Sequence, residues 1–318
     1  SSWTEVADMT TARGQSSAAG NTTNGLVFGG NVPPATANTE EWTGAGAPVG
    51  AWSTGGSLNT ARTGMAGAGI QTAALGFGGT PPVSALTEAY NGTSWTEVND
   101  LNTARNFLGG AGTQTSALAF GGNGNKTIAE SWDGTSWTEV GDLNTGRDQL
   151  ASAGADNTSA LGFGGQGPLT GKTESWNGSA WTEVGDLNEG REALGGTGIS
   201  TAALAIGGYA DVPINAPTAL TESWNGSSWT EVGDLNTARI RLSAGGTTTS
   251  ALAFGGGPPN TAVTEEWNGS AWTEVADLST ARGALAGVGT TAAALAFGGN
   301  DGSPTAATEE WNGAGSPA

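Results

Sequence analysis

Residues 221–239 read T-E-S-W-N-G-S-S-W-T-E-V-G-D-L-N-T-A-R, and near-copies of this phrase recur along the whole chain. A run of small residues follows each copy, and then a phrase such as A-L-A-F-G-G at 251–256. Seven copies fit one register, and the tryptophans that open the W-T-E-V phrase are Trp3, Trp52, Trp95, Trp137, Trp181, Trp229 and Trp272. Their spacings are 49, 43, 42, 44, 48 and 43 residues, and a period in the forties is typical of propeller repeats.

Each copy predicts four short strands. The small-residue run, for example 284–289, is the first strand, and a phrase such as 251–254, which ends at a glycine pair, is the second. Residues such as 221–224 form the third strand and 228–232 the fourth. No window has a helical period, so the repeat unit is a four-stranded antiparallel sheet.

The third and fourth strands are predicted to form a tight hairpin. Asn225-Gly226 lies between them, and this dipeptide favours a turn because its residues tolerate a positive φ. The separation of Trp224 and Trp229 places both indoles on the same face of the hairpin, whether the loop holds two residues or four.

Four-stranded units without helices predict a β-propeller, in which small side chains line the central axis. The predicted inner strands are rich in Gly and Ala, as at 64–69, 109–112 and 195–198. The chain ends on a third strand (309–313), and it starts on a fourth strand (2–6), so pairing of these two would close the ring. We therefore predict an all-β fold: one seven-bladed β-propeller of four-stranded antiparallel blades over residues 1–318, closed by the N-terminal strand.

These residues resemble kelch repeats, which combine a glycine pair, an aromatic residue, a tryptophan and an arginine. The glycine pairs begin at Gly29, Gly78, Gly121, Gly164, Gly207, Gly255 and Gly298. The arginines are Arg13, Arg62, Arg105, Arg147, Arg191, Arg239 and Arg282. The usual third-strand tyrosine is Tyr90 in one copy and tryptophan in the other six. The sequences of these repeats are similar to those of the Gly/Thr-rich kelch-type repeats in virion and tail-associated proteins of marine bacteriophages.

Composition excludes several functions. The chain has a net charge of −19, which opposes binding to nucleic acid or anionic membranes, and no apolar stretch is long enough to span a membrane. It contains no Cys and no His, so thiolate and imidazole chemistry are excluded. Copper radical oxidases of the kelch type need His, and the acidic residues occupy repeated framework positions. We predict no enzymatic activity, no cofactor and no metal site. Because the chain starts at Ser1 without Met, we expect it to be a piece of a longer polypeptide.

The repeated tryptophans and arginines are predicted to be structural. All thirteen Trp fall on framework positions, where large aromatic side chains pack adjacent blades together. Each copy also carries a glutamate before the third-strand aromatic residue, and a partly buried arginine is usually paired with a carboxylate. Six copies have an aspartate at the end of the fourth strand, which we assign to turns between blades; a cation-gathering ring at the channel mouth is the alternative. These aspartates are Asp8, Asp100, Asp142, Asp186, Asp234 and Asp277.

The connection from the second to the third strand varies between copies while the framework around it is repeated. The connections are 31–39, 80–86, 123–128, 166–172, 209–220, 257–263 and 300–307, and in a propeller they lie on one face. A rigid scaffold that displays divergent loops is typical of recognition surfaces. The candidate binding residues, chosen for their chemical variety, are Tyr209, Asp211, Asn215, Lys172, Lys126 and Asp301.

The sequence therefore predicts a non-enzymatic recognition or adhesion module, found in a virion or outside the cell. In this hypothesis the variable loops of a phage tail or fibre protein bind a glycan or protein of the host surface. The alternative is a purely structural decoration or spacer domain that binds neighbouring virion proteins.

Overall fold

The structure, a computed structural model, describes residues 50–167, 171–210 and 216–313 and the backbone of three strands within residues 17–43. The chain forms two compact units, Ser1–Pro48 and Val49–Ala318. Among the described residues, all regular secondary structure is β-strand, which confirms the predicted all-β class. No helix in the described ranges is long and apolar enough to cross a membrane.

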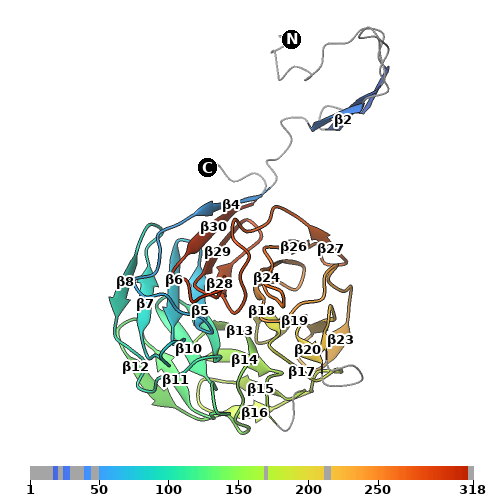
Figure 1. The fold of residues 1–318 in the computed structure, drawn as a ribbon. Helices are drawn as coiled ribbons and strands as arrows, with labels where there is room; N and C mark the ends of the chain where they lie inside the picture. Colours follow the sequence, from blue (N-terminus) through green and yellow to red (C-terminus); the bar gives the residue numbers. More distant parts are fainter. Residues whose placement is uncertain are drawn as a thin grey trace, which may run out of the picture. The chain divides into compact units, whose positions relative to one another are not determined.

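The Val49–Ala318 unit is built from six four-stranded antiparallel sheets, which are the blades of a propeller (Figure 1). The first blade contains β5 (Ala66–Ile70), β6 (Ala73–Phe77), β7 (Thr87–Tyr90) and β8 (Trp95–Val98), and the second contains β9 (Gly109–Thr113), β10 (Ser116–Phe120), β11 (Ala129–Trp132) and β12 (Trp137–Val140). The third contains β13 (Ala151–Asp156), β14 (Ser159–Phe163), β15 (Thr173–Trp176) and β16 (Trp181–Glu183). The fourth contains β18 (Gly195–Ile199), β19 (Ala202–Ile206), β22 (Thr221–Trp224) and β23 (Trp229–Glu231). The fifth contains β24 (Ser243–Thr247), β25 (Ser250–Phe254), β26 (Thr264–Trp267) and β27 (Trp272–Glu274). The sixth contains β28 (Ala286–Gly289), β29 (Ala293–Phe297), β30 (Thr308–Asn312) and β4 (Ala51–Thr54).

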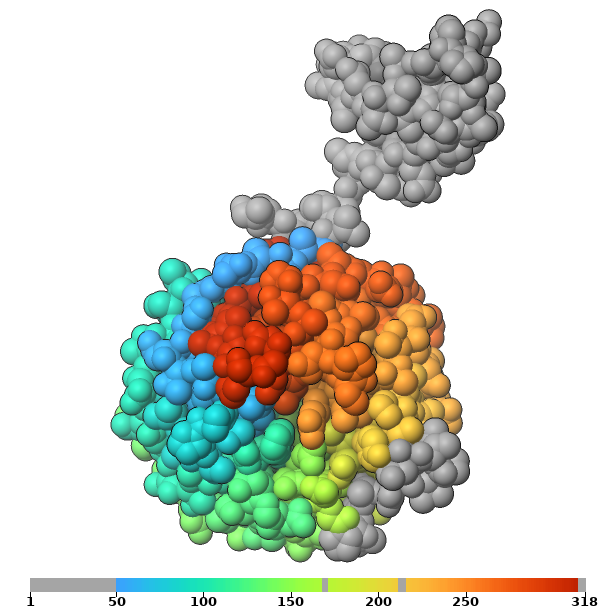
Figure 2. Space-filling model, in the orientation of Figure 1, coloured from blue at the N-terminus to red at the C-terminus, as the bar shows by residue number. Residues whose placement is uncertain are grey.

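The six blades form a closed ring. The innermost strand of each blade contacts those of its two neighbours, and β28 of the sixth blade contacts β5 of the first. In the space-filling view the blades follow one another in chain order, and the start of this unit (blue) lies beside its end (red) (Figure 2). A smaller sheet pairs two strands of the fourth blade's connection, β20 (Tyr209–Ala210) and β21 (Ala216–Pro217), with β17 (Arg191–Glu192).

The strand that closes the ring differs from the prediction. The last third strand, β30, pairs with β4, so that Trp311 lies opposite Trp52, and the predicted closure by residues 2–6 is wrong. Trp3 lies outside the described residues. All seven repeats form antiparallel sheets, but the ring contains six of them. The sheet of the first repeat has three strands, β1 (Ser17–Gly20), β2 (Asn24–Phe28) and β3 (Thr39–Thr43).

The linker before β4 explains this closure. In the next five copies the aromatic residues of the third and fourth strands are five positions apart and joined by Asn-Gly or Asp-Gly, as between Trp224 and Trp229. Trp42 and Trp52 are ten positions apart, and the residues between them include Pro48 but no Asn-Gly turn. The sequence before β4 therefore lacks the hairpin signal of the other copies, and β4 pairs with β30, whose sheet has no other fourth strand.

Aromatic side chains join neighbouring blades. In five blades the Phe at the end of the second strand packs against the fourth-strand Trp of the next blade, edge-on in Phe77–Trp137 with ring centroids 4.9 Å apart. In the fourth blade this Phe is replaced by Ile206. Second strands such as β10 are buried on both faces, because both faces of their blade pack against neighbouring blades. In fourth strands such as β8 the Trp points inward and the following Thr and Glu face solvent. Six of the seven fourth-strand tryptophans predicted to be structural lie in these contacts or in the equivalent position; they are Trp52, Trp95, Trp137, Trp181, Trp229 and Trp272.

The indole N–H groups extend the contact between blades. Five fourth-strand tryptophans donate from Nε1 to the Oγ1 of the threonine that begins the third strand of the preceding blade, at 3.0–3.2 Å. In the second blade this position is Ala129. The Nε1 of Trp181 is accordingly buried without a hydrogen-bond partner.

Each described repeat arginine forms a buried ion pair, as Arg105 shows. Its Nη2 lies 2.8 Å from Oε1 of Glu130, and its Nη1 donates to the carbonyls of Gly121 and Ile128. Glu130 Oε2 also accepts the backbone N–H of Asn102. Burial lowers the pKa of Arg105, and the carboxylate opposes this effect. The equivalent pairs are Arg62–Glu88, Arg147–Glu174, Arg191–Glu222, Arg239–Glu265 and Arg282–Glu309, whereas Arg13 lies outside the described residues.

The repeated aspartates have a local structural role. Asp100 Oδ1 accepts the backbone N–H of Thr87, the first residue of the third strand, at 3.0 Å. Four equivalents, Asp142, Asp186, Asp234 and Asp277, bind the corresponding N–H of their own blades at 3.0–3.4 Å. Within the described ranges, no group of three or more acidic side chains could hold a metal ion.

A candidate binding site at the mouth of the channel

Six equivalent residues, one per blade, form a ring of backbone hydrogen bonds around the propeller axis. Each residue lies just before an inner strand, and its N–H donates to the carbonyl of the equivalent residue in the preceding blade, at 2.6–2.9 Å. The last bond, from Gly64 N to Ala284 O, joins the first blade to the sixth and completes the circle. We call this set the axial ring; its members are Gly64, Phe107, Gln149, Ala193, Arg241 and Ala284.

The axial ring imposes a left-handed backbone on all six residues. Their φ angles lie between +51° and +62°, a region that costs a non-glycine residue roughly 1–2 kcal/mol. Gly64 adopts this conformation without that cost, so the backbone of the axial ring by itself favours glycine at each of these positions. The ring nevertheless carries three large side chains, Phe107, Gln149 and Arg241. Residues held in such conformations cluster at functional sites, which makes this position a candidate for function.

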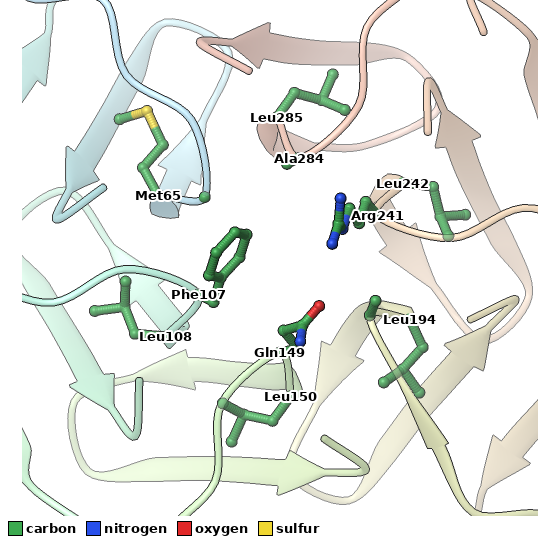
Figure 3. Close-up of a pocket in the computed structure, with 12 residues that line it drawn as sticks. Met65, Phe107, Leu108, Gln149, Leu150, Leu194, Arg241, Leu242, Ala284 and Leu285 are labelled. Atoms are coloured by element: carbon green, nitrogen blue, oxygen red, sulfur yellow. The ribbon is translucent and has the colours of Figure 1, made fainter. Parts of the chain in front are cut away.

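The three large side chains surround the mouth of the channel (Figure 3). Phe107 and Arg241 project into the opening from different blades, and the Cζ of Arg241 lies 6.0 Å from the centroid of the Phe107 ring. Gln149 enters from the third blade, next to that of Phe107, and donates from Nε2 to Oε1 of Gln166 at 3.1 Å. Beneath the ring, a buried Met or Leu from each blade seals the wall, as Leu108 and Leu150 do. The opening is a shallow cup of about 120 Å³.

A second cavity of about 300 Å³ opens from the side of this cup, and we call it the loop pocket. It shares Phe107, Arg241 and Ala284 with the cup, and its other lining residues are Thr63, Ile240, Gly257, Pro258, Asn260, Gly283 and Asn300. Two variable connections, 257–263 and 300–307, supply part of this wall. Asn260 Nδ2 donates to the carbonyl of Asn300 at 2.8 Å and so ties the two connections together. The channel mouth and these variable loops therefore lie on the same face.

Arg241 is chemically different from the repeat arginines. The six described repeat arginines are buried and paired with glutamate, whereas Arg241 is exposed, and no carboxylate in the described ranges forms an ion pair with it. Its guanidinium group is free to bind an anion. Guanidinium matches planar carboxylates and tetrahedral oxyanions through two parallel hydrogen bonds.

One acidic group near the cup is held in an unfavourable environment. Asp148 directly precedes Gln149, and its Oδ1 is buried without a hydrogen-bond partner in the part of the chain that the structure describes. Burial raises the pKa of Asp148, although hydrogen bonds from the backbone of Gly124 and from the Gln149 side chain lower it in part.

The binding residues proposed from the sequence do not converge on one place. Tyr209 is half-buried in β20, and Asp301 Oδ1 accepts the backbone N–H of Ser303 within a turn. Lys126 donates from Nζ to the Asn123 carbonyl, and Lys172 forms an ion pair with Glu183. Asp211 and Asn215 lie outside the described residues. The four described residues belong to four different blades, and none of them lines the cup or the loop pocket.

The axial ring was not predicted from the sequence, although the sequence contains a signal for it. The three residues after the repeat arginine read T-G-M, N-F-L, D-Q-L, E-A-L, I-R-L and G-A-L in the six blades. The middle position varies between Gly, Phe, Gln, Ala and Arg, while the arginine before it and the Leu or Met after it repeat. The residue before the middle position also varies, so two adjacent positions change within a repeated phrase, and such variation is the same signal that pointed to the connecting loops.

Comparison with known proteins adds no functional assignment. A scan against protein-family models and a search of curated proteins found no match to this chain.

Proposed function

We propose that this protein is a non-enzymatic recognition module, which binds a cell-surface glycan or protein with the face that carries the axial ring and the variable connections. The observation that carries this proposal is the break in symmetry at the axial ring. The framework repeats from blade to blade, but Phe107, Gln149 and Arg241 occupy a position where the backbone favours glycine. Side chains kept at that cost, beside a cavity and an unpaired cation, are typical of a binding site.

The setting of this module is also part of the proposal. The sequences of the repeats are similar to those of kelch-type repeats in phage virion proteins. This similarity supports the proposal that the protein belongs to a phage tail or fibre. Such a protein would meet its ligand outside the host cell. The structural alternative, a spacer bound to other virion proteins, would bury this same face against a neighbouring subunit.

A comparison of the two mouths of the channel tests the proposal. The test variant carries Phe107→Ala, Gln149→Ala and Arg241→Ala. The control variant carries three truncations at the opposite mouth, Ile70→Ala, Thr113→Ala and Ile199→Ala, where these exposed residues end inner strands. Both variants and the wild type are tested for binding to a glycan array and to host cells.

We expect the wild type and the control to bind alike and the axial variant to lose binding. Equal binding by all three proteins would place recognition elsewhere on the molecule. If the wild type binds neither glycans nor cells, and is buried in purified particles at fixed stoichiometry, the spacer function replaces the proposed one.

A further inference from the structure

We infer that the cup and the loop pocket together bind one anionic sugar residue within an otherwise neutral glycan. This inference rests on the proposed function and specifies its ligand. Arg241 would bind a carboxylate or sulfate ester, Phe107 would pack against the C–H face of the sugar ring, and Asn260 and Asn300 would bind hydroxyl groups.

The charge of the ligand follows from Arg241. In the described ranges every other arginine is neutralised by glutamate, and Lys172 is paired with Glu183. Arg241 therefore presents a charge and a donor fork that no described carboxylate satisfies. The protein as a whole carries a net charge of −19, which repels a polyanion. An isolated negative group on a neutral chain gains the contact with Arg241 and avoids most of that repulsion.

The shape of the ligand follows from Phe107. The guanidinium carbon of Arg241 lies over this half-buried ring, 6.0 Å from its centroid, so the aromatic and the cationic side chain meet at the mouth of the channel. The site thus places an apolar surface directly beside a cationic group. A pyranose ring with a charged substituent has the matching division, because its axial C–H groups form an apolar face beside the polar substituents.

The hydroxyl contacts follow from the two asparagines. Asn260 uses its Nδ2 to donate to the Asn300 carbonyl, so its Oδ1 remains as an acceptor. Asn300 Oδ1 accepts the backbone N–H of Gly302 at 2.9 Å, so its Nδ2 remains as a donor. No described residue bonds to either remaining group. The loop pocket thus offers one donor and one acceptor, which together suit sugar hydroxyls.

The size of the site limits the ligand to a single residue. The loop pocket has a volume of about 300 Å³, which is at the small end of the roughly 300–1,000 Å³ usual for ligand sites. The adjoining cup is open to solvent above the ring and leaves room for the rest of a glycan chain to continue outward.

Calorimetric titration of the full chain with three sugars tests the inference. The probes are methyl glucuronide, methyl glucoside and glucose 6-sulfate, which share a ring and differ in charge. Each is titrated into the wild type, Arg241→Gln, Arg241→Lys, Phe107→Ala and the control Lys126→Gln. The control removes a positive charge from the second blade's connection, which lines neither the cup nor the loop pocket, and leaves the site intact. Thermal melts establish that each variant is folded.

We expect at least one anionic sugar to bind more tightly than methyl glucoside. Arg241→Gln should weaken that binding by about tenfold or more, because a charge-assisted hydrogen bond is lost. Arg241→Lys should retain part of the affinity, Phe107→Ala should weaken both charged and neutral probes, and Lys126→Gln should change little. The tighter of the two anionic probes identifies the group that Arg241 binds.

Two results would overturn the inference. The first is equal binding of the glucoside and the anionic sugars with no effect of Arg241→Gln, which would leave the proposed recognition function intact. The second is no binding of any probe although the glycan array finds another ligand. A protein that binds neither the probes, the array nor cells would contradict the proposed function itself.

Discussion

Ala129→Thr is expected to stabilise the propeller, because Trp181 has a buried Nε1–H without a partner among the described residues. In five other blades the corresponding indole donates to a threonine Oγ1 at 3.0–3.2 Å. The backbone at Ala129 is held as in those blades, since Asp142 accepts its N–H. A threonine here would therefore place its hydroxyl within reach of Trp181.

The size of the expected stabilisation by Ala129→Thr follows from the free-energy cost of the unpaired Trp181 N–H. A buried N–H without a partner costs about 1–3 kcal/mol, and we expect the new hydrogen bond to recover about 1–2 kcal/mol of unfolding free energy. For a unit of this size that gain corresponds to a rise of roughly 2–6 °C in melting temperature. Thermal and denaturant unfolding of Ala129→Thr, measured beside the wild type, give both quantities.

Two matched variants separate the hydrogen bond from packing. Ala129→Val adds nearly the same volume without a hydroxyl, so it should gain nothing and leave the Trp181 N–H buried. Thr87→Ala removes the acceptor of Trp137 and should lower stability by about 1–2 kcal/mol. If Ala129→Val is as stable as Ala129→Thr, or if Thr87→Ala does not lower the unfolding free energy, the indole hydrogen bond does not contribute to stability as expected.

Three further predictions concern the Arg105–Glu130 ion pair, the buried Asp148 and the closing strand β4. Glu130→Gln should lower the unfolding free energy by about 3–5 kcal/mol, because it leaves a buried arginine without its carboxylate. Glu139→Gln, which changes the exposed glutamate opposite Glu130 on the edge strand β12, should change the unfolding free energy little; urea midpoints of the two variants decide this. Asp148→Asn should raise the melting temperature at neutral pH, because burial raises the pKa of Asp148 in the folded state and its ionised form destabilises the protein. The difference in melting temperature from the wild type should shrink as the pH falls toward about 4, where the wild-type carboxyl group becomes protonated. Melts across pH that show a constant difference would contradict this. Deletion of Ser1–Pro48 should leave the melting temperature of the ring unchanged. A deletion that also removes β4 should lower the unfolding free energy by at least about 3 kcal/mol, because it uncovers the edge of β30 and removes a packed Trp. Calorimetry of both truncations checks this.

Local pattern was sufficient to predict the sheets, because each strand and turn is encoded within one repeat. The Asn-Gly hairpin is an example: Asn225 Oδ1 accepts the backbone N–H groups of Ser227 and Ser228, so three neighbouring residues determine the turn. The roles of the repeat tryptophans and arginines also followed, since a residue repeated in every copy is most simply explained by the framework.

The closure of the ring and the binding site depend on contacts between distant residues. β4 and β30 are separated by most of the chain, and counting copies could not decide which fourth strand would pair with the last blade. The ten-residue spacing between Trp42 and Trp52 was the relevant signal. The left-handed backbone at Phe107 and Arg241 has no local signature, because neither residue favours it, and it follows from hydrogen bonds to other blades.

The circle of amides at the channel mouth also has a consequence for changes in the number of blades. Each member donates to one neighbour and accepts from the other, so the removal of one blade would break two of the six hydrogen bonds at once. The donor and the acceptor left at the break would need new partners, because an unpaired backbone group costs free energy wherever water cannot reach it.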